Sequence, residues 1–150
     1  MSKWYGSIDN RLEENRNHLG REIRVGDDIT EYLWSDRHCY YVTRVDSQKH
    51  IFVKPYQVCA DQDKAGGMGH QDWLYFKTIK EEHEYLNKHF PEKGYPTENI
   101  NEPAEIELAF RYNHWYKVSR MFYGQPLEKP MYERMNISFG VRDYYYDWEF

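Results

Sequence analysis

The last sixteen residues, Met135–Phe150, constrain the fold most, because their apolar side chains alternate in two different phases. The apolar residues of Ile137–Val141 fall on odd positions, whereas a row of aromatic residues in Tyr144–Phe150 falls on even positions. Successive side chains of a strand point to opposite faces, so this change of parity requires a bulge or a turn, which we expect at Arg142–Asp143. The segment therefore predicts a strand pair or one bent strand that is docked into a sheet. The face opposite the aromatic row carries Asp143, Tyr145, Asp147 and Glu149.

Aromatic rings must supply much of the core. The 150 residues include 15 Tyr, 5 Trp and 7 Phe, whereas Ile, Leu and Val number only 8, 7 and 7. Each buried aromatic side chain removes roughly 150–250 Å² from water, so a core can be built with few aliphatic residues. Only four alanines are present, although Ala is the best helix former. This composition favours a sheet-rich domain.

The pattern along the chain predicts a single α+β domain over residues 1–150, mainly of antiparallel strands. A capping box of Thr78 and Glu81 begins a helix that ends near Pro91, and a shorter helix is expected over 7–19. Strands are expected near 29–34, 39–45, 50–56, 73–76, 104–112 and 115–123 and in the last segment, with loops over 61–72, 91–103 and 124–130. So many short strands must protect their edges, which predicts a small barrel or a strongly curved sheet with two helices.

Charge and hydropathy argue against several classes of protein. The formal net charge of −5 is spread evenly over the two halves of the chain, which does not favour a nucleic-acid binder driven by phosphate contacts. No run of residues is apolar enough to span a membrane, and no leader peptide opens the chain. We therefore expect a cytoplasmic protein that does not act at a membrane. The two cysteines, Cys39 and Cys59, are expected to be reduced, although a disulfide between them stays open.

No catalytic or metal-binding pattern assembles along the sequence. The glycines of 66–69 lack the lysine of a phosphate-binding loop. His38 and Cys39 are neighbours on a predicted strand, so their side chains point to opposite faces. The cysteines and histidines lack the spacing of a zinc site, and Asp143 and Asp147 are too far apart on a strand to share a proton. These observations predict a protein that is not an enzyme and has no cofactor or metal.

Aromatic residues beside charged ones are the candidate binding residues. Tyr and Trp are favoured where one end of the side chain is dry and the other is wet, and they are typical interface anchors. The turn after residue 33 combines an indole, a carboxylate and a guanidinium, and the guanidinium could stack on a ring or hold an anion. The alternative is that the rings fill the core and that the turn charges only pair locally. The candidates are Trp34, Asp36, Arg37, Trp115, Tyr116, Tyr145 and Asp147.

Three segments, 3–15, 25–37 and 136–150, together resemble a group of short uncharacterised proteins encoded in phages and mobile elements of gut bacteria. The centre of the chain, residues 57–100, does not share the resemblance, and no catalytic residue or ligand carries over from the group. The resemblance implies a small accessory protein of mobile DNA that acts inside a bacterial cell. Proteins of this origin often bind a host target, including defence proteins.

The leading expectation is therefore a non-enzymatic binding protein that inhibits or modulates a host protein through an aromatic-rich surface. The alternative is a binder of a nucleotide or of single-stranded nucleic acid, including a sponge for a nucleotide signal. In that alternative, scattered arginines would hold phosphates while aromatic rings stack on bases. A small enzyme is the third hypothesis, and a homo-oligomer stays open. The arginines in question are Arg37, Arg44, Arg111, Arg120 and Arg142.

Overall fold

The computed structural model describes residues 19–64 and 71–146 of the chain. Its elements are mainly antiparallel strands, with one α-helix and one 3-10 turn, which confirms the predicted α+β class. The helix expected over 7–19 falls outside the described residues, apart from Leu19, and so does the centre of the loop expected over 61–72.

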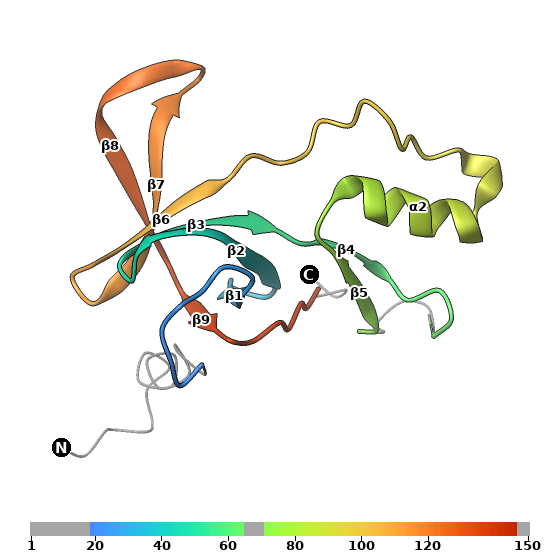
Figure 1. Ribbon diagram of the computed structural model, residues 1–150, viewed down its shortest axis with the longest axis horizontal. Coiled ribbons are helices and arrows are strands. Elements are labelled where there is room, and N and C mark those ends of the chain that lie inside the picture. The colour runs from blue at the N-terminus through green and yellow to red at the C-terminus, as the bar shows by residue number, and fades with distance from the viewer. Residues whose placement is uncertain (1–18, 65–70, 147–150) are drawn as a thin grey trace.

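Seven strands form one curled sheet in the shape of a half-barrel (Figure 1). The order across the sheet is β8-β7-β6-β3-β2-β1-β9, and every neighbouring pair is antiparallel. This confirms the strongly curved sheet expected from the many short strands. The strands are β1 (Asp28–Tyr32), β2 (Arg37–Ser47), β3 (His50–Pro55), β6 (Ile106–Arg111), β7 (His114–Phe122), β8 (Gln125–Met135) and β9 (Ile137–Phe139).

A single residue, Asn136, separates β8 from β9, the two strands at opposite ends of the strand order. β8 pairs with β7 up to Met135, and after Asn136 the chain continues as β9, which pairs with β1. The N–H of Tyr32 donates to the carbonyl of Asn136 at 2.8 Å, which holds this corner. The chain therefore changes partner without a loop, and this forces the sheet to curl.

The concave face of the sheet holds the main core. Ile29, Val42 and Ile51 are fully buried there, and the ring of Phe139 lies 5.3 Å from that of Trp115. Trp115 is only 4% exposed and also packs on Phe110. The structure therefore places this candidate binding residue inside the core, because odd positions of β7 face inward at this point.

The last segment forms a shorter strand than its pattern predicts. Only Ile137–Phe139 pairs in the sheet, and all three residues are buried. Gly140 then turns the chain at φ 81°, a conformation that glycine adopts without steric cost. The break thus comes before the expected position at Arg142–Asp143. Further on, Tyr145 forms an isolated antiparallel bridge with Arg37.

The loop expected over 124–130 is wrong, because these residues belong to β8. Tyr123 and Gly124 form a tight turn with φ of 49° and 76°, and β8 begins directly after it. Two prolines, Pro126 and Pro130, suggested a loop. They are tolerated because β8 is at one end of the strand order and is irregularly paired, and edge strands and bulges accept proline.

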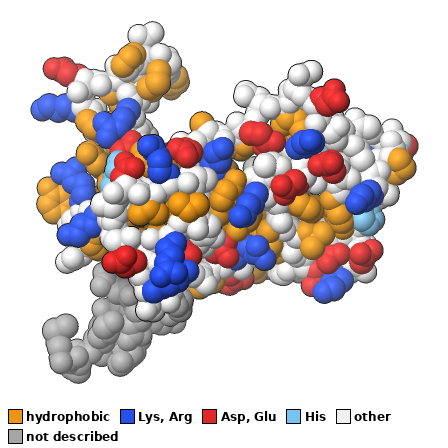
Figure 2. Space-filling model, viewed as in Figure 1, with side chains coloured by type: hydrophobic (Ala, Val, Ile, Leu, Met, Phe, Trp, Pro, Cys, Tyr) orange, Lys and Arg blue, Asp and Glu red, His pale blue; other side chains and the backbone are white. Residues whose placement is uncertain are grey.

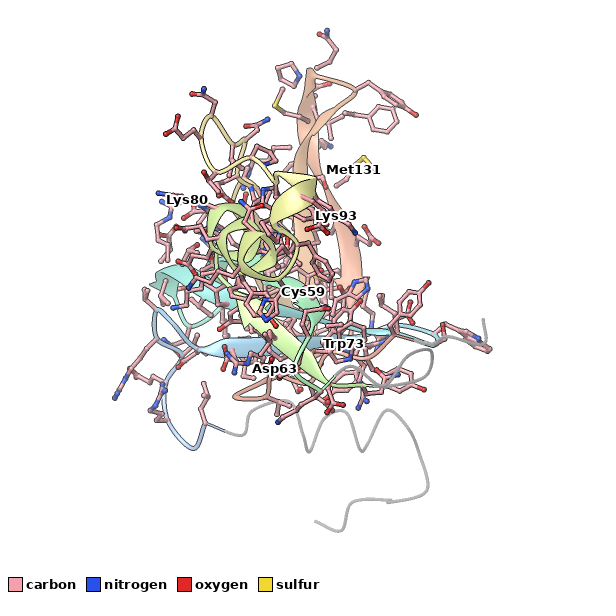
Figure 3. All side chains as sticks on the ribbon, turned by 90° about the vertical axis from the view of Figure 1, so that its right-hand side faces the viewer. Cys59, Asp63, Trp73, Lys80, Lys93 and Met131 are labelled. Atoms are coloured by element: carbon pink, nitrogen blue, oxygen red, sulfur yellow. The ribbon has the colours of Figure 1, made fainter. Side chains whose placement is uncertain are left out.

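A smaller unit lies at the opposite end of the molecule from the β7–β8 hairpin (Figure 1). It consists of the β4–β5 hairpin (Gln57–Ala60 and Trp73–Phe76), helix α2 (Ile79–His89) and the turn η1 (Pro91–Lys93). Thr78 caps α2 by accepting a hydrogen bond from the N–H of Glu81 at 3.1 Å, as the capping box predicts. Figure 3 shows Cys59 and Trp73 on the hairpin that α2 covers.

Candidate functional site

The end of the β7–β8 hairpin projects from the half-barrel as a two-stranded arm (Figure 1). Pairing between β6 and β7 stops at Val118, so beyond this residue β7 has only β8 as a partner among the described strands. We call residues 119–131 the arm. An isolated two-stranded ribbon is marginally stable in water, so the arm gains little from its own packing.

Apolar side chains cover the end of the arm. Tyr123 is 89% exposed at the turn, and its ring lies 4.3 Å from that of Phe122, which is 52% exposed. Met121 and Met131 are exposed as well, and Met131 is labelled on the arm in Figure 3. Figure 2 shows the same feature as hydrophobic atoms gathered at the end of the projection. A cluster of exposed apolar residues on a projecting element is typical of an interaction site.

Two tyrosines have a left-handed backbone conformation, which is unfavourable for this residue type. Tyr123 and Tyr112 have φ of 49° and 51°, and each is the first central residue of a hairpin turn. Such turns normally use Asn, Asp or Gly, because a left-handed backbone costs an ordinary residue about 1–2 kcal/mol. Both rings are nevertheless held out into solvent. Turn formation does not explain these residues, whereas contact with another molecule would.

A niche lies at the base of the arm, on the outer face of β6, β7 and β8. It has a volume of about 310 Å³ and is lined by one arginine and three tyrosines. We call it the tyrosine niche. Tyr116, a predicted binding residue, is one of its walls and meets the ring of Tyr132 edge to face at 6.3 Å. The lining residues are Arg111, Tyr112, Tyr116 and Tyr132.

A second hollow of about 760 Å³ lies between the end of β1 and β8, where the half-barrel is open. Trp34, another predicted binding residue, lies at its rim and is 91% exposed. Glu133 and Arg134 line the opposite side with opposite charges. Glu31 also lines a neighbouring hollow, where its carboxylate accepts a hydrogen bond from the hydroxyl of Tyr40 at 2.9 Å. Burial raises the pKa of Tyr40, so this phenol stays protonated and the pair is structural.

The side chain of Arg37, a predicted binding residue, already interacts with other residues of the chain. Its guanidinium pairs with Asp143 at 2.7 Å and lies 5.0 Å from the ring of Tyr145. The backbones of Arg37 and Tyr145 also exchange two hydrogen bonds. Arg37 and Tyr145 therefore hold the C-terminal segment against β2. Asp36 also has an interaction within the molecule, and Asp147 lies outside the described residues.

Other tyrosines fill a second core, on the face of β2 opposite the main core. Cys39, Tyr41 and Tyr56 are buried there, and Tyr75 and Tyr144 pack against them. The hydroxyl of Tyr56 donates to Asp28, and that of Tyr75 accepts a hydrogen bond from the backbone of Tyr144 at 2.8 Å. These rings thus have partners for their polar tips. They help to hold β2 against the β4–β5 hairpin and the C-terminal segment.

Potential metal ligands are dispersed over the described residues. In residues 19–64 and 71–146, no three His, Cys, Asp or Glu side chains gather where they could hold a metal ion. Cys39 and Cys59 are free thiols, and burial raises the pKa of both, so neither is activated as a nucleophile.

The sequence interpretation missed most of the exposed groups. The sequence pattern singles out Arg111 only as one of five scattered arginines, and it divides the apolar end of the arm between a strand and a loop. The available signal was the pair Tyr123-Gly124 between two extended runs, since a left-handed hairpin turn requires a residue such as Gly. The missed residues are Tyr112, Met121, Phe122, Tyr123, Met131 and Tyr132.

No protein-family model matches this chain, and no curated protein or solved structure shows significant similarity to it. In the part of the chain that the structure describes, no helix combines the length and apolarity needed to cross a membrane.

Proposed function

We propose that this chain is a non-enzymatic binding protein that engages another protein through its arm. The observation that carries the proposal is the apolar end of the arm, with Phe122 and Tyr123 exposed on a ribbon in which β7 and β8 pair only with each other among the described strands. Leaving these rings in water forgoes the stabilisation that burial provides, about 25 cal/mol per Å². Burial in a complementary groove of a partner would recover it.

The side chains at the end of the arm suit a protein partner. Aromatic residues and Met are enriched in protein interfaces, and aromatic anchors often dominate the binding energy. The thioethers of Met121 and Met131 are flexible and can adapt to an irregular apolar surface. The resemblance of both ends of the chain to phage and mobile-element proteins makes a bacterial host protein the partner that we propose. Binding of this kind would inhibit or modulate that protein.

Tyr123 provides a test in which stability and binding change in opposite directions. We expect Tyr123→Asn to stabilise the fold by about 0.5–1 kcal/mol, because Asn tolerates the left-handed backbone better than Tyr. The same change should weaken partner binding at least about tenfold by removing an exposed anchor. Thermal unfolding measures the first effect. The second is measured by capture of host proteins with a photo-crosslinking residue in place of Gln125, an exposed position beside the turn.

The matched control is Val25→Thr, which alters an exposed apolar residue away from the arm. It should leave the captured protein unchanged, and unlabelled wild-type protein should compete with capture. Capture of the same protein by the Tyr123→Asn variant at wild-type efficiency would contradict the proposal. Light scattering of the purified chain measures its oligomeric state. If the wild type is a dimer and the Tyr123→Asn variant is a monomer, the partner is a second copy of this chain.

A further inference from the structure

We propose that the tyrosine niche binds a mononucleotide, whose base stacks on the tyrosine rings and whose phosphate contacts Arg111. The site is separate from the end of the arm, so the proposal does not depend on the function proposed above. Its volume of about 310 Å³ is near the lower end of the range for small-ligand sites, roughly 300–1,000 Å³.

The guanidinium of Arg111 is oriented so that it could bind an anion. It lies 4.4 Å from the ring of Tyr132 and 5.4 Å from that of Tyr112. These contacts fix the guanidinium, while its N–H donors lie around the edge of the plane and are suited to a phosphate. No carboxylate of the described residues forms an ion pair with Arg111. An anionic ligand would supply the missing partner.

The other four arginines that the sequence suggests as phosphate ligands already interact with carboxylates or aromatic rings of the chain. Arg37 pairs with Asp143, Arg120 binds Glu107, and Arg44 lies over the ring of Phe52 with two carboxylates within 4 Å. Arg142 lies over the rings of the second core. Arg111 is therefore the arginine of this group that combines exposed aromatic neighbours with unsatisfied donors.

Strand register places a further positive group on the same face. Arg134 is the cross-strand partner of Tyr116, and residues paired in this way share a face of the sheet. Glu107 is also on this face, but its carboxylate is paired with the guanidinium of Arg120 at 2.8 Å. The surroundings of the niche thus favour an anion.

Tyr112 supplies an independent argument. It is 77% exposed and holds a left-handed backbone beside Arg111, although the following Asn113 shows that the turn can use a residue better suited to it. The ring therefore borders the niche at a cost to the fold. Strain of this kind is concentrated at functional positions. A base stacked on an aromatic ring gains about 1–3 kcal/mol, which would repay the cost.

A mononucleotide fits better than a nucleic-acid strand. The chain carries a formal net charge of −5, which repels an extended polyphosphate. The niche is a single recess with one arginine in its wall, so it matches one base and its attached phosphate.

The test is calorimetric titration of the full chain with the four nucleoside 5′-monophosphates. Adenosine and ribose 5-phosphate, which carry the base and the phosphate of adenosine monophosphate separately, are titrated for comparison. We expect at least one monophosphate to bind with a Kd below about 1 mM, and each half to bind at least about tenfold more weakly. Arg111→Gln, which keeps a polar side chain but removes the charge, should weaken binding about tenfold. Tyr112→Asn should also weaken it while leaving the turn intact.

Arm variant Tyr123→Asn is the matched control and should retain the wild-type nucleotide affinity. Loss of partner capture in that variant, with nucleotide affinity unchanged, distinguishes the two proposals. The niche proposal is overturned if no monophosphate saturates the protein at about 5 mM. It is equally overturned if Arg111→Gln and Tyr112→Asn leave affinity unchanged, or if ribose 5-phosphate binds as tightly as the complete nucleotide.

Discussion

Replacing Phe139 by alanine is expected to destabilise the protein by about 3–5 kcal/mol, the largest effect of any single change considered. Phe139 is only 1% exposed, and its ring packs against Trp115 on the concave face of the half-barrel. It belongs to β9, whose pairing with β1 holds one edge of the sheet. Truncation would leave a cavity in the main core and loosen that edge as well.

Chemical denaturation monitored by tryptophan fluorescence measures this loss, because Trp115 reports directly on the affected contact. The same substitution on the arm, Phe122→Ala, is the matched control. Phe122 is 52% exposed and should lose less than about 0.5 kcal/mol. A loss of less than about 1.5 kcal/mol for Phe139→Ala would show that β9 does not hold the sheet together as described.

Glu107→Gln is expected to destabilise the protein by about 2 kcal/mol at pH 7 and by progressively less as the pH falls. Two hydrogen bonds from Arg120, at 2.8 and 2.9 Å, and one with His50 lower the pKa of Glu107 to about 2. The lowered pKa means that this carboxylate stabilises the folded state above its ordinary pKa of 4.5. That contribution is lost as the pH falls from about 4.5 towards 2. Arg120 is well exposed, so solvent screening keeps the effect below the full value of the shift.

Denaturation curves of the wild type and of Glu107→Gln, recorded between pH 7 and pH 2, measure this dependence. The two curves should converge at the acid end. Glu105→Gln is the control, since this more exposed carboxylate lies 3.7 Å from Arg44 and its loss should cost less than about 0.5 kcal/mol. A difference between wild type and Glu107→Gln that stays constant with pH would contradict the assignment.

Predictions that rest on neighbouring residues agree with the structure. Helix α2 was predicted because its cap and its apolar spacing are local signals, and Thr78 does cap it. The strands β1, β2 and β3 were predicted because alternation and turn residues also act over a few positions. β8 was missed because two prolines normally indicate a loop, and only its place at the end of the strand order makes them acceptable.

Candidate residues were harder to predict, because alternation separates two faces without showing which one is buried. Trp115 and Tyr116 are neighbours, yet the first is in the core and the second lines the tyrosine niche. Arg37 was proposed for binding, but its partner Asp143 is 106 positions away in the chain. No local pattern reports such a contact.

Local signals in the chain specify the class of the fold, the main helix and most of the strands, since each depends on backbone preferences and side-chain periods within a few residues. Tertiary structure alone decided how the sheet curls through Asn136 and which aromatic residues are buried. It also decided that β7 extends beyond Val118, the last residue of β7 that pairs with β6. That difference in strand length leaves Phe122 and Tyr123 in solvent, because burial depends on which strand lies alongside and not on the residue itself.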